Sequence, residues 1–186
     1  MPIDSTSLLP EPWLEFLSEL DANAVEPIDF HCLGGFVVTL VYGAERTTSD
    51  VDVLMFVPKT EASLVGLGQK GSDLHKRHKV YLDPVGVATP PEDYDQRLVK
   101  MFPGTFKNIR LFALDAYDIA LTKLERNSPK DREDVKYLAR TVPFDLDVLQ
   151  ERYRKELRDY LFVPEREDLT LKLWIELIKE ERERLS

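Results

Sequence analysis

The chain is poor in the features that mark secreted and membrane proteins. It has one cysteine, Cys32, so no intrachain disulfide can form, which agrees with a reducing compartment. No apolar run approaches the roughly 20 residues needed to span a bilayer. The first residues, "MPIDSTSLLPEPW", lack the basic start and apolar middle of a signal peptide. We therefore expect a cytoplasmic protein without a membrane segment.

Positive charge is also scarce. The sequence has 34 acidic residues against 25 lysines and arginines, a formal charge of −9. Such a charge argues against broad, sequence-independent binding of DNA or other polyanions. The densest basic cluster is "LHKRHKV", residues 74–80. It fits either a solvated helix end or a local contact with the phosphates of a nucleotide or nucleic acid, and both interpretations stay open.

The order of the expected elements predicts the fold class. Apolar spacing and residue preferences predict a helix over 10–22, strands over 27–33, 49–57, 79–87 and 105–114, a helix or loop over 90–102, and helices over 115–126, 128–141, 145–162 and 166–185. Segment 34–45 is ambiguous, because its Val, Thr and Tyr favour a strand while its glycines fit a helix. We expect an α/β (α+β) core at 1–142 with an N-terminal helix, and a C-terminal helical extension at 143–186 packed on that core.

Two aspartates open the firmest strand, "SDVDVLMFV". Side chains alternate along a strand, so Thr48, Asp50 and Asp52 point to one face with about 7 Å between successive members. That spacing suits carboxylates that bind metal ions. An exposed polar strand edge is the alternative. The unbroken apolar run 54–57 favours a central strand covered on both faces, which places the aspartates at a rim where ligands bind.

Adjacent glycines precede this strand. If Gly34 and Gly35 open a helix, their backbone N–H groups and the positive end of the helix dipole form an anion site. A tight turn explains the pair equally well. A phosphate cradle followed by paired carboxylates would suit a nucleoside triphosphate with its metal ions.

Three further residues are candidates. Asp83 is either a third carboxylate, able to take a proton from an acceptor hydroxyl, or the start of an Asp-Pro turn. Lys123 falls within the apolar arc of its helix, so it either snorkels to solvent or meets an anion such as a triphosphate. Asp131 follows Ser128 and Pro129 in a pattern typical of a capping box, and on local grounds we favour capping.

A resemblance follows from these residues. "LGGFVVTLVYGAERTTSDVDVL" resembles the Gly-Gly (or Gly-Ser), spacer, Asp-x-Asp signature of the DNA polymerase β-type nucleotidyltransferase superfamily. The longer sequence is similar to the AbiEii-type nucleotidyltransferases, toxins of bacterial abortive-infection and toxin–antitoxin systems, and to uncharacterised relatives. Their Arg-x-Thr-x-Asp-x-Asp segment is matched by Arg46, Thr48, Asp50 and Asp52.

Two helical motifs extend the resemblance. An Asp-x-x-Asp-x-x-x-x-Lys-Leu helix is matched by Asp115–Leu124, and a Lys-Asp-x-x-Asp-Val helix by Lys130–Val135. Each motif alone is loose, but the set is specific and covers residues 29–140. There are two departures from the family pattern. Gly35 stands where many members have a serine, which removes a hydroxyl that would touch a phosphate. The third carboxylate is not always present, which leaves Asp83 provisional.

The resemblance implies a nucleotidyltransferase fold, with a mixed central β-sheet flanked by helices, a helix after Gly34 and Gly35, and a C-terminal helical subdomain. It implies transfer of a nucleoside monophosphate from ATP or another NTP to a hydroxyl of RNA, tRNA or protein, with two Mg²⁺ ions, or Mn²⁺. The implied nucleotide contacts are Gly34, Gly35, Arg46, Thr48, Ser49 and Lys123. The implied metal ligands are Asp50, Asp52 and Asp83, and catalysis would involve these three carboxylates together with Lys123 and Asp131.

The resemblance also implies partners. An active member would belong to a toxin–antitoxin system and meet a cognate antitoxin. The alternative is a catalytically inactive module of the same fold, or an antitoxin-like interaction protein. A stripe in the C-terminal helices would then be its partner or dimer surface, although such a stripe more often packs within its own domain. The stripe comprises Leu146, Leu149, Tyr153 and Tyr160.

Overall fold

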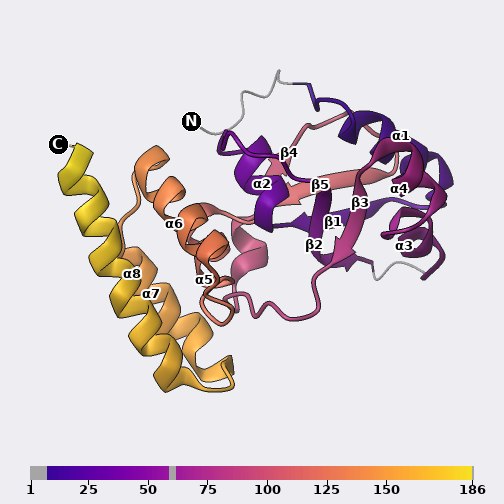
Figure 1. Cartoon of the computed structure of the whole chain (residues 1–186). Helices are drawn as coiled ribbons and strands as arrows, with labels where there is room; N and C mark the ends of the chain where they lie inside the picture. Colours follow the sequence, from indigo (N-terminus) through magenta and orange to yellow (C-terminus); the bar gives the residue numbers. More distant parts are fainter. Residues whose placement is uncertain (1–7, 59–61, 186) are drawn as a thin grey trace. The chain divides into compact units, whose positions relative to one another are not determined.

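The computed structural model describes residues 8–58 and 62–185. Its contacts divide the chain into two compact units. Figure 1 shows the chain coloured along its sequence. The sheet unit runs through Gly86 and adds Leu98–Leu114, and the helical unit holds Val87–Arg97 and the chain from Asp115 onward. In this division, residues 115–142 group with the C-terminal helices. The expected division into 1–142 and 143–186 stays a prediction.

A five-stranded mixed sheet forms the first unit, with the order β3-β2-β1-β5-β4. β1 pairs antiparallel with β2 and parallel with β5, while β2 and β3 are parallel and β4 and β5 antiparallel. The prediction of a mixed central sheet is thereby confirmed. The strands are β1 Ile28–Cys32, β2 Asp50–Val57, β3 Tyr81–Pro84, β4 Val99–Met101 and β5 Ile109–Ala113.

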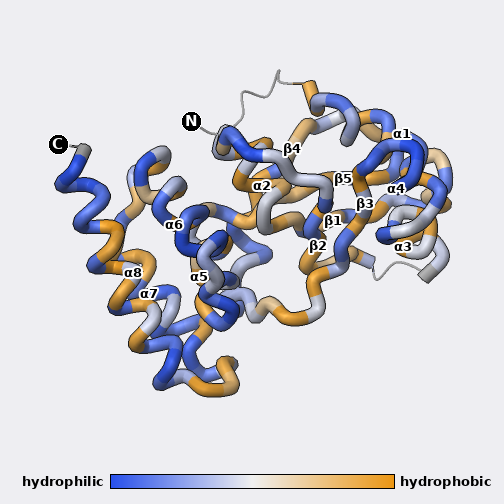
Figure 2. Tube along the Cα trace, viewed as in Figure 1, coloured by the Kyte–Doolittle hydropathy of each residue, from blue (hydrophilic) through white to orange (hydrophobic). Residues whose placement is uncertain are grey.

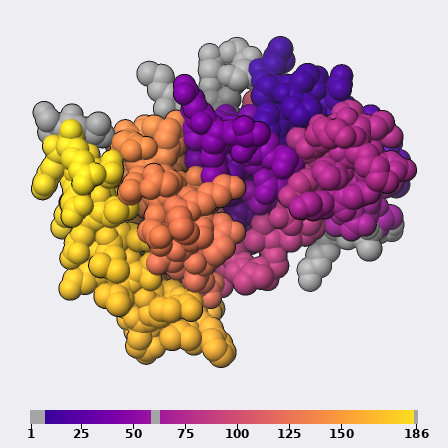
Figure 3. All heavy atoms as spheres, viewed as in Figure 1, coloured from indigo at the N-terminus to yellow at the C-terminus, as the bar shows by residue number. Residues whose placement is uncertain are grey.

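Four helices accompany the sheet: α1 Trp13–Asn23, α2 Gly34–Leu40, α3 Ala62–Gly68 and α4 Asp73–His78. α1 buries Phe16, Leu17 and Leu20, which recur at helical spacing and gave its prediction. The ambiguous segment is a helix, α2, against its β-propensity. α3, α4 and β4 were not predicted as such. Figure 3 shows the indigo surface of α1 beside the magenta surface that carries α3 and α4, and α1 contacts both.

The helical unit begins with a 3₁₀ turn and is otherwise built from helices, as the sequence predicts. Its elements are η1 Tyr94–Arg97, α5 Ala116–Leu121, α6 Pro129–Thr141, α7 Leu146–Arg152, the π-helical turn η2 Tyr153–Leu157, η3 Arg158–Tyr160 and α8 Pro164–Leu185. Apolar and polar residues alternate along α8 in Figure 2. Leu149 and Tyr153 are buried, so this part of the expected partner stripe packs within its own unit, while Tyr160 is exposed.

β2 corrects one prediction. It lies inside the sheet as expected, but it is not covered on both faces, because Met55 is 43% and Val57 40% exposed. The reason is a bulge. His31 of β1 pairs with Met55, yet the next residue, Cys32, pairs with Val53, so β2 carries one extra residue there. A bulge shifts the alternation of side chains, so Val51 and Val53 are buried before it while Met55 and Val57 are exposed after it.

A membrane-spanning helix needs sufficient length and hydropathy. Within the described residues, no helix is both long and apolar enough to cross a bilayer.

A single buried carboxylate links α1 to the start of β5. Asp21 accepts hydrogen bonds from the backbone N–H groups of Lys107 at 3.0 Å, Asn108 at 2.7 Å and Ile109 at 2.6 Å. These donors precede and open β5, and Asp21 is 9% exposed. This side chain therefore satisfies three successive backbone groups at the start of β5, of which the Ile109 N–H is buried.

We expect Asp21→Ala to lower the free energy of unfolding by about 2–3 kcal/mol, because three backbone donors, one of them at buried Ile109, lose a charged acceptor. Urea denaturation followed by circular dichroism measures this. Glu26→Ala, an exposed acidic residue shortly after α1, is the control and should change stability by less than about 0.5 kcal/mol. Equal effects of the two substitutions would contradict a capping role for Asp21.

Candidate functional site

Three carboxylates converge at the edge where β2 and β3 run side by side. The parallel pairing sets Asp52 opposite Asp83 and Asp50 opposite Tyr81. One ligand atom from each of Asp50, Asp52 and Asp83 lies within 4.8 Å of the others. Asp50 and Asp52 are half-buried. Three carboxylate oxygens at this spacing form a donor set that hard divalent cations prefer.

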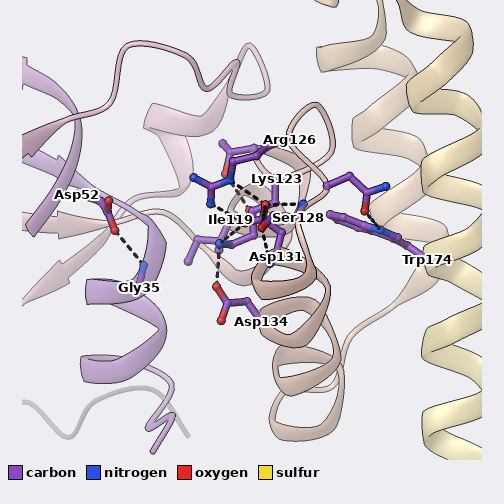
Figure 4. Close-up of polar contacts among 11 residues, drawn as sticks. Gly35, Asp52, Ile119, Lys123, Arg126, Ser128, Asp131, Asp134 and Trp174 are labelled. Carbon is purple, nitrogen blue, oxygen red and sulfur yellow. Dashed lines mark hydrogen bonds and ion pairs between the residues drawn. The ribbon is translucent and has the colours of Figure 1, made fainter. Parts of the chain in front are cut away.

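The glycine pair lies directly against this cluster. The Gly35 N–H donates to Asp52 Oδ2 at 2.9 Å, the contact shown in Figure 4. Gly34 has φ +65°, and a Cβ there would lie 2.1 Å from the same oxygen. Only glycine combines this backbone conformation with so close an approach. The pair therefore brings the start of α2 onto Asp52 and orients its carboxylate, so the Gly35 N–H is already bonded to a protein anion.

Two other predicted nucleotide contacts lie beside Gly35. A Cβ at this glycine would lie 2.6 Å from Arg46 Nη2 and 3.1 Å from Thr48 Oγ1. The Thr48 hydroxyl in turn donates to Asp50 Oδ1. The Arg46 guanidinium thus fills the space that a serine side chain at position 35 would need. Ser49 contributes through its backbone, because its carbonyl accepts the Tyr81 N–H at 3.0 Å and joins β2 to β3.

Lys123 and Asp131 meet each other in the helical unit. Lys123 Nζ donates to Asp131 Oδ1 at 3.2 Å and to Asp134 Oδ2 at 2.8 Å, and the lysine is 5% exposed. The lysine therefore does not snorkel, since its ammonium is held by two carboxylates of the protein. Asp134 was not named as a site residue from the sequence, although it is the second aspartate of the Lys-Asp-x-x-Asp-Val motif and lies three residues after Asp131 on the helix.

Asp131 is also a capping residue, as predicted on local grounds. The Ser128 side chain accepts the Asp131 N–H, and the Asp131 carboxylate accepts the Ser128 N–H, which is a capping box with proline at the start of the helix. Arg126 also donates to Asp131, and Figure 4 shows these side chains around it. Burial raises the pKa of Asp131, but the hydrogen bonds from Arg126 and Ser128 and the charge of Lys123 outweigh burial and hold the pKa below its usual range.

The predicted site residues thus form two groups, one in each unit. The sheet unit brings together Asp50, Asp52, Asp83, Gly34, Gly35, Arg46 and Thr48. The helical unit brings together Lys123 and Asp131.

One comparison with known proteins identifies relatives. The model of the family described as "Nucleotidyltransferase of unknown function (DUF6036)" matches residues 14–182. This match covers nearly the whole chain, and it includes both the carboxylate cluster and the Lys123–Asp131 pair. No curated protein and no solved structure matches the chain.

The contact between Gly34 and Asp52 predicts a specific loss of stability. Gly34→Ala should lower the free energy of unfolding by about 1–2 kcal/mol, because alanine disfavours the left-handed backbone conformation. It should lose about 1–3 kcal/mol more, because the new Cβ overlaps the Asp52 carboxylate. Gly71→Ala is the matched control, since Gly71 has φ +89° with nothing within 4 Å of its Cβ position. Chemical denaturation of both variants measures the difference, and equal losses would mean that the Asp52 contact adds nothing.

The Lys123 contacts predict that this residue stabilises the helical unit. Lys123→Met leaves Asp131 and Asp134 without their shared cation, which should cost about 3–5 kcal/mol. Lys136→Met is the control, because Lys136 pairs with Glu133, whose side chain is 66% exposed, and should cost less than about 1 kcal/mol. Thermal and urea unfolding provide the test. A Lys123→Met protein as stable as the wild type would refute the structural role.

Proposed function

Because the chain belongs to this family of nucleotidyltransferases of unknown function, we propose that it transfers a nucleoside monophosphate from a nucleoside triphosphate to an acceptor hydroxyl. The observation that carries the proposal is the convergence of Asp50, Asp52 and Asp83 within 4.8 Å. Like charges at this distance repel, so the cluster costs stability unless a cation offsets it. A scaffold without such a function has little reason to keep three carboxylates together.

The cluster fits Mg²⁺ by its chemistry, and Mn²⁺ as a substitute. All three donors are carboxylates, the hard oxygen ligands that these ions take in preference to nitrogen or sulfur. Bound there, the ions would neutralise charge on the triphosphate and on the transferred phosphoryl group. Asp50 and Asp52 would hold the ions, and Asp83 would be the third ligand or the base for the acceptor.

In the proposed reaction, an acceptor oxygen forms a bond to the α-phosphorus of the nucleotide while the bond from that phosphorus to the bridging oxygen of the β-phosphate breaks. Pyrophosphate leaves, and Asp83 takes the acceptor proton. The Gly35 N–H keeps the Asp52 carboxylate oriented through this step. Its role is thus to fix a ligand in advance, which lowers the cost of reorganisation during the reaction.

The triphosphate would lie along the start of α2, where Arg46 and Thr48 adjoin Gly35. Arg46 offers a planar guanidinium that suits two phosphate oxygens at once, and Thr48 and Ser49 add hydroxyls. The motif resemblance adds Lys123 as a further triphosphate contact, with Asp131 as the residue that orients it. That role would require the lysine to exchange a carboxylate partner for a phosphate, since Asp131 and Asp134 hold it in the structure.

The acceptor and the biological setting rest on the motif resemblance alone. The similarity to AbiEii-type proteins supports RNA, tRNA or a protein hydroxyl as the acceptor, ATP or another NTP as the donor, and a role in a toxin–antitoxin pair.

The proposal is tested by incubating the purified chain with each α-³²P-labelled NTP, Mg²⁺ or Mn²⁺, and cellular RNA or protein. We expect label on one fraction and a loss of at least about 100-fold in Asp50→Asn and in Asp52→Asn, because each removes a metal-binding charge. Asp73→Asn, an exposed carboxylate on α4 that pairs with Lys76, should retain full activity.

Circular dichroism must show that the variants are folded. A wild-type chain that neither binds nor consumes any NTP would overturn the proposal and favour an inactive binding module of the same fold.

A further inference from the structure

An aromatic ring lies beside the carboxylate cluster at the outer strand of the sheet. Tyr81 opens β3 two residues before Asp83, so both side chains leave the same face of the strand. Because Asp83 converges with Asp50 and Asp52, Tyr81 shares their side of the sheet. Burial, followed by the charges of Asp50, Asp83 and Asp52, raises the pKa of the Tyr81 hydroxyl, which agrees with this placement. The ring itself is half-buried.

Two basic side chains pack on this ring. Lys70 Nζ lies over it, 5.4 Å from the centroid, and the His75 ring meets it edge-on at 5.1 Å. His75 Nδ1 accepts the Gly71 N–H at 2.9 Å, so the neutral ring carries its hydrogen on Nε2 and keeps a donor there. A cation, a nitrogen donor and an aromatic face are therefore gathered next to three carboxylates in a chain of net charge −9.

The backbone fixes these groups in place. Gln69, the neighbour of Lys70, forms a bridge with Leu82 of β3. Gly68 packs so closely that a Cβ there would lie 2.8 Å from the Leu82 side chain. The end of α3 is thereby held against β3, and Lys70 is held near Tyr81.

The residues of the basic run "LHKRHKV" make two kinds of contact. Arg77 and His78 both contact Glu19 of α1, and Lys76 pairs with Asp73. The ion pairs of Lys76, Arg77 and His78 agree with a solvated helix end, one of the two interpretations of this run that the sequence allows. His75 lies on the ring of Tyr81 instead, so it belongs to the side of the sheet that carries the carboxylates.

The strand order places this group opposite the proposed triphosphate. The glycine pair and Arg46 lie where β1 leads into α2, on one side of β2, and β3 lies on the other side of β2. In phosphoryl transfer the attacking and leaving oxygens are roughly in line. If pyrophosphate leaves toward α2, the acceptor must approach over β3, where Tyr81 lies.

We propose that Tyr81, Lys70 and His75 form the acceptor subsite, which binds a nucleotide unit with its phosphate next to the attacking hydroxyl. Lys70 and the His75 Nε2–H would bind phosphate oxygens, and the Tyr81 ring would stack on the base. The acceptor is then a free nucleotide or the end of an RNA strand, because a protein hydroxyl brings neither a phosphate nor a base. The assignment of this subsite to the acceptor rests on the proposed function.

The test measures binding without any NTP. A single-stranded adenosine RNA hexamer with 5′-fluorescein is titrated with the full chain in Mg²⁺ and followed by fluorescence anisotropy. Lys70→Gln and Tyr81→Leu should each weaken binding about tenfold, through the lost phosphate contact and the lost stacking. Lys100→Gln on β4, at the opposite edge of the sheet, removes the same charge and should change binding less than twofold.

Competition separates the two sources of the ligand. Displacement of the hexamer by adenosine 5′-monophosphate at similar concentration would assign the subsite to a free nucleotide, and displacement by unlabelled hexamer alone would assign it to a strand. Both results support the subsite. Absence of hexamer and nucleotide binding by the wild type, or unchanged binding by Lys70→Gln, would overturn it. Lys70→Gln covers the case in which Tyr81→Leu fails to fold.

The two proposals fail in distinguishable ways. If no NTP is consumed but hexamer binding depends on Lys70 and Tyr81, the transferase proposal fails and the binding site stands. If label is transferred to protein while hexamer binding is absent, the subsite fails and the transferase stands. With an active enzyme, Lys70→Gln should raise the KM for the RNA acceptor and leave the KM for NTP unchanged. A raised KM for NTP alone would place Lys70 on the donor side and overturn the assignment.

Discussion

The contact between the start of α2 and the Asp52 carboxylate is the constraint on which the candidate site depends. It joins the end of β1 to the side chains of β2, and it requires glycine at two successive positions for different reasons. Gly34 has a positive φ and lies so close to Asp52 that a side chain would overlap it. Gly35 donates its N–H to Asp52, and the Arg46 guanidinium occupies the space where a Cβ of residue 35 would lie. The sequence pattern thus reflects close packing of the backbone around a carboxylate as much as any room for a phosphate.

The buried carboxylates of the helical unit have basic side chains of the protein as partners. In the sheet unit, one ligand atom from each of three carboxylates lies within 4.8 Å of the others. In the helical unit, Asp131 and Asp134 share Lys123, and Asp131 also accepts from Arg126 and takes part in the cap of α6. Buried acids with such partners are satisfied within the protein. The close carboxylates of the sheet unit are therefore the ones that we propose as cation ligands, and Asp131 caps α6 whatever further role it has.

Much of the fold follows from local patterns. The apolar spacing of α1 and of the C-terminal helices predicts their existence, and the alternation at Asp50 and Asp52 predicts their shared face. Long-range features do not follow in this way. The parallel pairing that sets Asp52 opposite Asp83 joins residues 31 positions apart, and the bulge opposite His31 depends on how two strands meet. The helix at Gly34–Leu40 contradicts its β-propensity, because tertiary contacts override a weak local preference. Tyr81 was not identified from the sequence, because its proposed role depends on tertiary contacts with Lys70 and His75.

The structure offers a physical reason for the glycine at position 35, where many members of the superfamily have a serine. Viewed in the sequence alone, it is the loss of a serine hydroxyl. In the structure the Arg46 guanidinium and the Thr48 hydroxyl occupy the volume that the serine would take. Glycine at position 35 and the present position of the Arg46 side chain therefore depend on each other, because a side chain at 35 would displace the arginine. Arg46, in the loop before β2, thus places a cation beside the start of α2, where its guanidinium could bind an anion.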